Sequence, residues 1–175
     1  MPTLFKIFVD ILLLQAGPQD IPASRFLFQA SLMLYFAAGV LASLSNFPPL
    51  SSVGISAVDT TLLALLVWIA LRMRHFDNRV LQTLTAVLGA LGLLTVISLP
   101  LDAWYAMLNP SDQESDQLPA LVMLGLLVWS LAVLGHILRH ALDIVPAMAA
   151  GLSLLYLILS FVLTTFLFIP VAGNG

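Results

Sequence analysis

The stretch from residue 118 to residue 138 reads LPALVMLGLLVWSLAVLGHIL and contains no Asp, Glu, Lys or Arg. A helix of about 20 apolar residues rises ~30 Å, which matches the hydrocarbon core of a bilayer. Inside lipid, only helices and closed barrels satisfy every backbone polar group. The stretch therefore predicts a transmembrane helix and sets the class of fold expected for the rest of the chain.

Four further stretches have the same apolar character. Together with the first, they predict transmembrane spans over residues 24–45, 56–73, 80–99, 118–138 and 144–169. Prolines set some of the expected ends, because a proline lacks the N–H group that would continue a helix. Pro48 and Pro49 follow the first span, and Pro100 follows the third. The predicted fold is all-α, a polytopic bundle of five transmembrane helices that forms a single integral membrane domain over residues 1–175.

Composition supports a membrane protein with almost no soluble mass. Of the 175 residues, 61% are hydrophobic and 9% are charged, whereas roughly a quarter of an ordinary soluble domain is charged. The chain has no cysteine, which excludes disulfides and thiolate metal sites. Its net charge of -3 and its scattered basic residues argue against nucleic acid as a partner. The lipid bilayer is the predicted environment.

The chain before the first span predicts a short helix that does not cross the membrane. Residues Leu4 to Leu14 are too few to span, and Lys6 and Asp10 interrupt their apolar run. A helix of this kind is expected to lie in the membrane interface. Pro18 and Pro22 follow it closely, so we expect a rigid elbow between this helix and the first span.

The lysines and arginines predict the orientation of the spans. In the five-span arrangement, all six basic residues fall on one side of the membrane: Lys6, Arg25, Arg72, Arg74, Arg79 and Arg139. The loop between residues 102 and 117 falls on the other side and is acidic through Asp102, Asp112, Glu114 and Asp116. Because basic loops stay in the cytoplasm, we expect a multi-pass protein of the bacterial inner membrane with its N-terminus in the cytoplasm and its C-terminus outside.

Three acidic residues lie near the membrane, and each has a structural explanation. Asp59 is expected in the first turn of the second span, and Asp143 is expected to cap the N-terminus of the fifth, where a helix dipole favours negative charge. Asp102 is expected in the acidic loop beyond Pro100. No charged residue is then expected in the middle third of a span, although transporters usually carry one there. This pattern disfavours transport.

Histidines provide the best candidates for a metal site. His136 and His140 are four residues apart, on one face of the fourth span near its inner end. Asp143 lies nearby in sequence, and His75 lies in the other inner loop. The alternative is that these side chains sit among lipid headgroups. Since no second ligand motif accompanies them, we expect neither a metal ion nor another cofactor.

Small residues recur at four-residue spacing in two spans. The pairs are Ala86-x-x-x-Ala90 and Ala147-x-x-x-Gly151. Such pairs let two membrane helices approach closely. They predict packing seams, either within the bundle or between copies of the chain.

The overall plan resembles the Yip1-like superfamily of small polytopic membrane proteins, which includes bacterial members. Residues that carry the resemblance are the N-terminal stretch LFKIFVD (residues 4–10) and the elbow GPQDIP (residues 17–22) before the first span. The resemblance implies five spans with a cytoplasmic N-terminus and an external C-terminus. Its eukaryotic members are associated with small GTPases and vesicle traffic, and no functional residue carries over from the family to this chain.

The residues favour a protein that works by contact. No set of acids, bases, nucleophiles or metal ligands gathers within the expected spans, so an enzyme is not expected. The first hypothesis is a non-catalytic subunit or interaction protein that forms a homo-oligomer or binds another membrane protein. The alternatives are a small transporter or channel, or a membrane enzyme or metal-binding protein that uses the inner-end residues His75, His136, His140 and Asp143.

Overall fold

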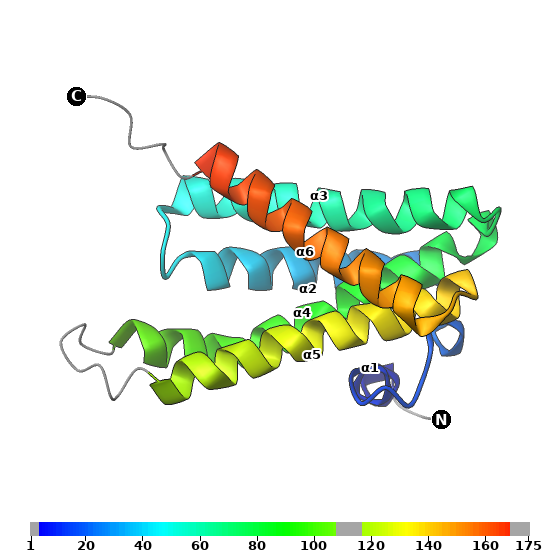
Figure 1. Cartoon of the computed structure of the whole chain (residues 1–175), viewed down its shortest axis with the longest axis horizontal. Helices are drawn as coiled ribbons and strands as arrows, with labels where there is room; N and C mark the ends of the chain where they lie inside the picture. Colours follow the sequence, from blue (N-terminus) through cyan, green and yellow to red (C-terminus); the bar gives the residue numbers. More distant parts are fainter. Residues whose placement is uncertain (1–3, 108–116, 169–175) are drawn as a thin grey trace.

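The protein is a bundle of long helices. The computed structural model describes residues 4–107 and 117–168, which contain helices and turns but no strand (Figure 1). Five helices are long and apolar enough to cross a membrane: α2 (Arg25–Ser43), α3 (Pro49–Met73), α4 (Val80–Met107), α5 (Gln117–Leu142) and α6 (Pro146–Phe168). Shorter elements are α1 (Leu4–Leu12) and the 3-10 turns η1 (Pro18–Asp20) and η2 (Asp77–Arg79). The predicted all-α bundle is confirmed, while the acidic segment with Asp112, Glu114 and Asp116 lies outside the described residues.

Two helices have bounds that differ from the expected spans. Helix α3 begins at Pro49, seven residues before the predicted start at residue 56. A proline at the first helical position costs nothing, because the N–H group it lacks would have no partner inside the helix. Helix α4 continues through Pro100 to Met107 instead of ending at residue 99. Membrane helices tolerate an internal proline where neighbouring groups satisfy the freed backbone.

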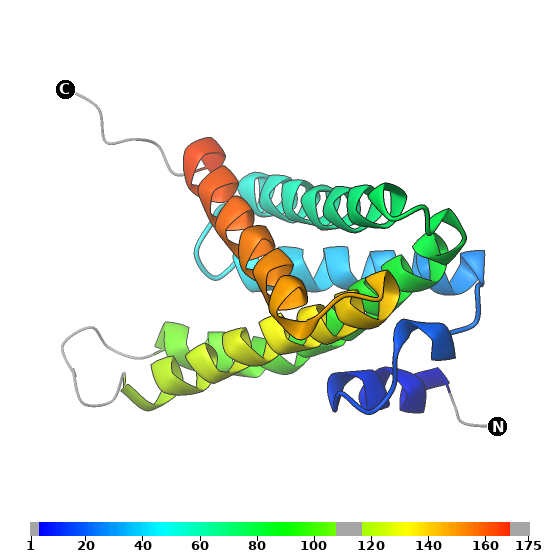
Figure 2. The same ribbon diagram turned by 45° about the vertical axis from the view of Figure 1, so that its right-hand side comes forward.

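Helix α4 lies at the centre of the bundle. Every residue from position 83 to position 92 is buried, and α4 packs against α1, α2, α3 and α5. Helix α6 runs obliquely across the bundle: it lies beside α5 near its first residues and reaches α3 near its last (Figures 1 and 2). The two hairpins α2–α3 and α4–α5 therefore meet most closely along the first half of α4.

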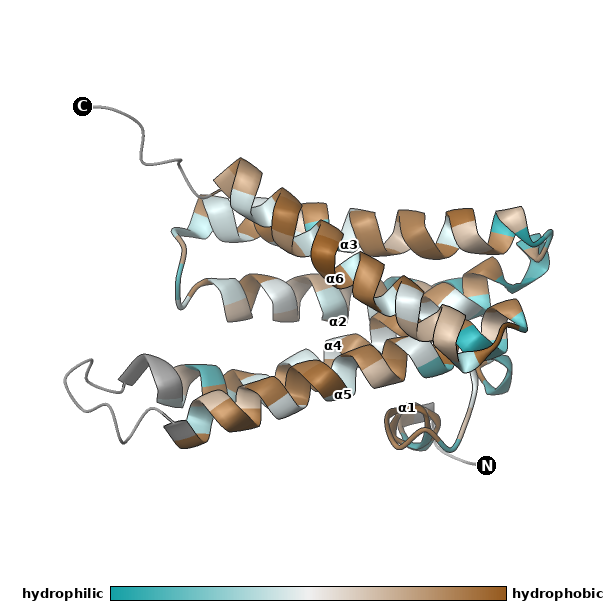
Figure 3. Ribbon diagram, in the orientation of Figure 1, coloured by the Kyte–Doolittle hydropathy of each residue, from teal (hydrophilic) through white to brown (hydrophobic). Residues whose placement is uncertain are grey.

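Charged residues distinguish the two ends of the bundle. Arginines lie at the start of α2, at the α3–α4 turn and near the end of α5, and we call this the basic end; its members are Arg25, Arg72, Arg74, Arg79 and Arg139. The opposite end, called the far end, holds the α2–α3 turn and the last residues of α4 and α6. Figure 3 shows hydrophobic residues along the length of the helices and hydrophilic ones gathered at the basic end.

Helix α1 is the predicted short N-terminal helix. It packs against the side of the bundle. It runs across the other helices and appears nearly end-on in Figure 1. Its Phe8 and Ile11 are buried, and the Phe8 ring fills the space beside Gly89 of α4, where a Cβ atom would collide with ring carbon Cε1. The indole Nε1 of Trp129 in α5 donates to the carbonyl of Leu12 over 3.1 Å. Helix α1 is thus attached to both α4 and α5.

Candidate functional site

Asp59 lies near the middle of α3. It follows Pro49 by ten residues and precedes Met73 by fourteen, which places it about 15 Å along the helix at a rise of 1.5 Å per residue. The prediction that Asp59 occupies the first turn of its span is wrong, because the helix starts earlier than expected. The prediction that no span carries a charged residue in its middle third is wrong for the same reason.

Three hydroxyl groups from two other helices surround the Asp59 carboxyl. Tyr35 of α2 donates to Oδ2 over 2.6 Å. Tyr156 of α6 donates to Oδ1 over 2.7 Å, and Ser160 of α6 donates to the same oxygen over 2.5 Å. The two tyrosine hydroxyls also lie 2.9 Å from each other. We call Asp59, Tyr35, Tyr156 and Ser160 the carboxyl cluster; it joins α2, α3 and α6 in the middle of the bundle.

Counting protons shows which state of Asp59 satisfies the whole cluster. The four residues make four polar contacts with one another, and each contact needs one proton between its two oxygens. Two tyrosines and one serine supply three protons. A fourth proton on the carboxyl completes the set, because the carboxyl then donates to one hydroxyl instead of accepting from it and frees that hydroxyl's proton for the contact between the tyrosines. An ionised carboxylate accepts from all three hydroxyls and leaves the contact between Tyr35 and Tyr156 without a proton.

A cleft lies against the carboxyl cluster. Its volume is about 360 Å³, and Tyr35, Tyr156 and Ser160 line it. Other polar residues in its wall are Thr95 and Ser98 of α4 and Ser130 of α5. These three hydroxyls donate to backbone carbonyls of their own helices, so they satisfy nearby backbone and still expose oxygen acceptors to the cleft. The cleft is a partly polar chamber within an otherwise apolar bundle.

The cleft extends toward the far end and is closed toward the basic end. On α4 its wall runs from Leu91 to Asp102, a distance of roughly 16 Å along the helix. One turn closer to the basic end, α4 and α5 pack together through fully buried apolar residues, namely Val87, Leu88, Ile137 and Leu138. A solute in the cleft can reach the hydroxyls of the carboxyl cluster, but this packing blocks its way to the basic end.

Asp102 lies within α4 at the far-end part of the cleft. It was expected in a loop, but the helix continues through Pro100 and carries it into the cleft wall. Its Oδ2 lies 3.4 Å from the hydroxyl oxygen of Ser98, one turn earlier, whose closer acceptor is the Thr95 carbonyl. Asp102 is therefore a carboxyl group in the cleft wall near the far end, while Asp59 lies behind the tyrosine hydroxyls that line the cleft.

The histidines at the basic end make backbone contacts. A carbonyl oxygen only accepts, so His136 donates from Nε2 to the Ala16 carbonyl over 3.0 Å, and His140 donates from Nδ1 to the His136 carbonyl over 2.8 Å. Their rings lie 4.3 Å apart between centroids. His75 lies in the separate α3–α4 turn. Within residues 4–107 and 117–168, no group of three His, Cys, Asp or Glu side chains is arranged to hold a metal ion.

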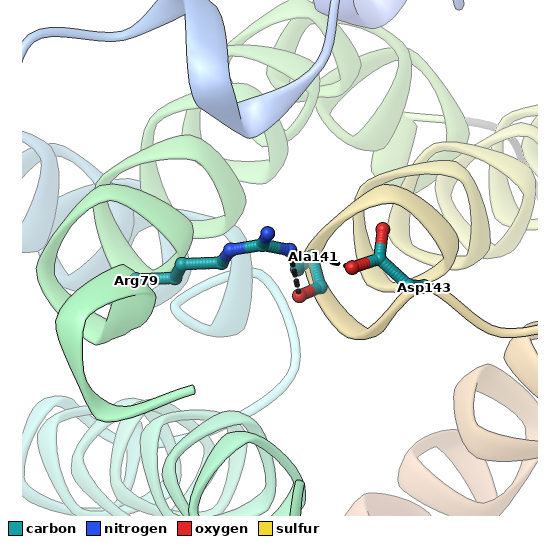
Figure 4. A network of polar contacts seen from close by, with 3 residues as sticks. All are labelled: Arg79, Ala141 and Asp143. Atoms are coloured by element: carbon teal, nitrogen blue, oxygen red, sulfur yellow. Dashed lines mark hydrogen bonds and ion pairs between the residues drawn. The ribbon is translucent and has the colours of Figure 1, made fainter. Parts of the chain in front are cut away.

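Asp143 pairs with an arginine and does not cap α6. It has a left-handed φ of 52° just after the end of α5, and α6 begins three residues later at Pro146. Its carboxylate accepts from Nη1 of Arg79 over 2.9 Å, and the same nitrogen donates to the Ala141 carbonyl over 3.3 Å (Figure 4). The predicted N-cap role is wrong, and Asp143 instead ties the α5–α6 turn to the start of α4.

Sequence reasoning missed the tyrosines that hold Asp59. Tyr35 and Tyr156 are two of the three tyrosines in the chain, and each lies in the middle of a long apolar helix. Membrane tyrosines usually sit at the water interface, so a tyrosine at mid-span indicates a buried polar partner. That signal was available in the sequence and would have pointed to Asp59.

Comparison with known proteins gives no family for this chain: no family model, curated protein or solved structure matches it. The resemblance to the Yip1-like superfamily stays a prediction. Any functional assignment therefore depends on the geometry of the carboxyl cluster and its cleft.

Proposed function

We propose that this protein is a small membrane transporter that carries a proton on Asp59, together with a small polar solute bound in the adjacent cleft. The observation that carries the proposal is the carboxyl cluster, with Asp59 near the middle of α3 and hydrogen bonds of 2.5 to 2.7 Å between its carboxyl and three hydroxyls. Ionisable residues inside the membrane are costly and by default indicate a proton or ion pathway. The hydroxyls of Tyr35 and Tyr156 supply the contacts that hold a neutral carboxyl and its proton.

A transporter fits the cleft better than a channel does. A channel needs a continuous path, whereas this cleft ends at Leu91 and Leu134 against a buried apolar layer. In a transporter, a central site is open to one side at a time. The oblique contact of α6 with both α3 and α5 offers a helix whose tilt could open the closed side, since α6 also carries two members of the carboxyl cluster.

The positive-inside rule supplies the direction of access. The arginines gather at the basic end, so that end is assigned to the cytoplasm and the far end to the outside. The cleft is then reached from outside the cell, across a membrane that we assign to a bacterial inner membrane. A proton would bind from the far end and leave toward the cytoplasm.

The experiment is proton uptake into liposomes that contain the purified protein and a pH-sensitive dye, with a negative inside potential set by potassium and valinomycin. Uptake is measured alone and with a panel of sugars, amino acids and amines. The proposal predicts protein-dependent uptake that is lost in Asp59→Asn. The matched control is Asp77→Asn, which removes an exposed carboxyl in the α3–α4 turn and should leave uptake intact. Equal uptake by wild type and Asp59→Asn would contradict the proposal.

A second candidate function is association through α6. Ala147 and Gly151 are exposed, and a Cβ atom built on Gly151 meets no atom within 4 Å among the described residues. This small-residue face is therefore open to a neighbour, in contrast to Ala86 and Ala90, which are buried inside the bundle. Close approach at such a face drives helix association in membranes. The partner would be a second copy of the chain or another membrane protein.

Gly151→Leu tests the association role. Leucine suits lipid but is too large for a close helix seam, so the variant should insert normally and lose assembly. Gly125→Leu is the matched control, because Gly125 in α5 is also exposed with open space beyond it but has large neighbours, Leu121 and Trp129, at four-residue spacing. Assembly is read from cross-linking in membranes. Equal cross-linking of both variants and wild type would remove this candidate.

A further inference from the structure

A second, smaller pocket lies at the basic end, far from the carboxyl cluster. Its volume is about 250 Å³, and it is enclosed by η1, the first turn of α4 and the end of α5. Gln19, Arg79, Thr83, His140 and Asp143 all contribute to its wall. Drug-sized ligands occupy larger pockets, typically about 300 to 1,000 Å³, so this space suits a group of only a few atoms.

Thr83 in this pocket has an unused hydroxyl. The residue is 1% exposed, and its Oγ1 has no hydrogen-bond partner among the described residues. Other threonines of α4 behave differently: Thr85 and Thr95 donate to the carbonyls four residues before them over 2.7 and 2.9 Å. A buried hydroxyl without a partner is costly. Its place in the pocket wall makes a ligand atom the natural partner.

Arg79 and Asp143 give the pocket one charge of each sign. Both hydrogen bonds of the guanidinium within the described residues, to Ala141 and Asp143, use Nη1, and its Cζ lies 4.5 Å from the centroid of the Phe76 ring. The N–H groups of Nη2 and Nε are left for another acceptor. The Asp143 side chain is 60% exposed and that of Arg79 is 45% exposed, so a ligand can reach both. His140 uses Nδ1 for its backbone bond, so Nε2 is its atom left for a ligand.

We propose that this pocket binds the headgroup of a phospholipid that carries both a phosphate and a primary amine. The phosphate would accept from Arg79 and from Thr83, since a guanidinium matches phosphate oxygens. The ammonium group would donate to Asp143. A purely anionic headgroup fits less well, because Asp143 would repel it. The pocket lies at the end of the bundle, where headgroups are concentrated, and pockets between membrane helices on this side are known sites for lipid headgroups.

The experiment is native mass spectrometry of delipidated protein in detergent, titrated with phosphatidylethanolamine, phosphatidylglycerol or phosphatidylcholine. Phosphatidylethanolamine should bind tightest, because only it combines the phosphate with N–H donors. Thr83→Val should weaken its binding about tenfold, as expected for one hydrogen bond to a charged group, and should not lower thermal stability. Thr85→Val is the matched control, since its hydroxyl is satisfied within α4. It should leave lipid binding unchanged.

Further variants and a soluble probe separate the alternatives. Asp143→Asn should reduce the preference for phosphatidylethanolamine over phosphatidylglycerol, and Arg139→Gln, outside the pocket lining, should not. Glycerophosphoethanolamine carries the same headgroup without acyl chains. If glycerophosphoethanolamine bound as tightly as the lipid, the ligand would be a free phosphate compound with an amine and not a membrane lipid. Unchanged lipid binding by Thr83→Val, or equal binding of the three lipids, would overturn the site itself.

Discussion

Removing single hydroxyls from the carboxyl cluster should lower stability in a defined order. Tyr35→Phe deletes two contacts, to Asp59 and to Tyr156. It also removes the single cluster contact of Asp59 Oδ2. Ser160→Ala deletes one contact and leaves Oδ1 bonded to Tyr156. Polar contacts between membrane helices contribute about 0.6 kcal/mol on average and up to ~1.7, so we expect losses of about 1.2 kcal/mol for Tyr35→Phe and about 0.6 kcal/mol for Ser160→Ala.

The assay is reversible unfolding in mixed micelles of a mild detergent and SDS, followed by loss of helical circular dichroism. Tyr156→Phe also deletes two contacts but leaves Oδ1 bonded to Ser160, so its loss should lie between the other two. Ser130→Ala is the control, because that hydroxyl bonds only the carbonyl of Leu127 in its own helix. A loss from Ser160→Ala equal to or larger than that from Tyr35→Phe would refute the contact pattern on which the proton count depends.

Two further sets of predictions concern α1 and the orientation of the bundle. Gly89→Leu should displace α1, because even a Cβ atom at Gly89 meets the ring of Phe8. A cysteine that replaces the fully buried Ile11 should then react quickly with a maleimide. Trp129→Phe deletes one hydrogen bond to α1 and should raise the labelling rate less. Slow labelling in both backgrounds would show that α1 is held by other contacts. Cysteine at the exposed Leu50 should react with an impermeant maleimide added to whole cells, whereas cysteine at Asp77 should react only after permeabilisation; the reverse pattern would invert the orientation.

The helices could be predicted because the sequence encodes them locally. Long runs without charge specify spans in any context, so α5 and α6 appear within a few residues of their predicted ranges. The start of α3 was placed too late because Pro49 and the serines after it are also typical of a loop. Contacts with the neighbouring helix distinguish a helical segment from a loop here, and the sequence does not show them. One such contact is the hydrogen bond that Ser56 Oγ donates to the carbonyl of Phe36 in α2 over 2.7 Å.

The site could not be predicted because it is assembled across helices. Asp59, Tyr35 and Tyr156 are far apart in sequence and meet only through the packing of α2, α3 and α6. The mid-span tyrosines indicate a buried polar partner, but their spans do not show which residue of another helix they meet, and the late start assigned to α3 hid the depth of Asp59. The histidines at the basic end show the opposite case. Their helical spacing correctly placed His136 and His140 side by side, but it could not reveal that one nitrogen of each ring is bonded to a backbone carbonyl.

Proton transport by this protein requires Asp59 to hold an exchangeable proton inside the membrane. Infrared spectroscopy of the protein in lipid measures this directly, because a protonated carboxyl and a carboxylate absorb at different frequencies. We predict a protonated-carboxyl band that is absent in Asp59→Asn, present in Asp77→Asn and shifted in heavy water. A spectrum in which Asp59→Asn removes only a carboxylate band at neutral pH would contradict the proton count and, with it, the proposed role of Asp59 in transport.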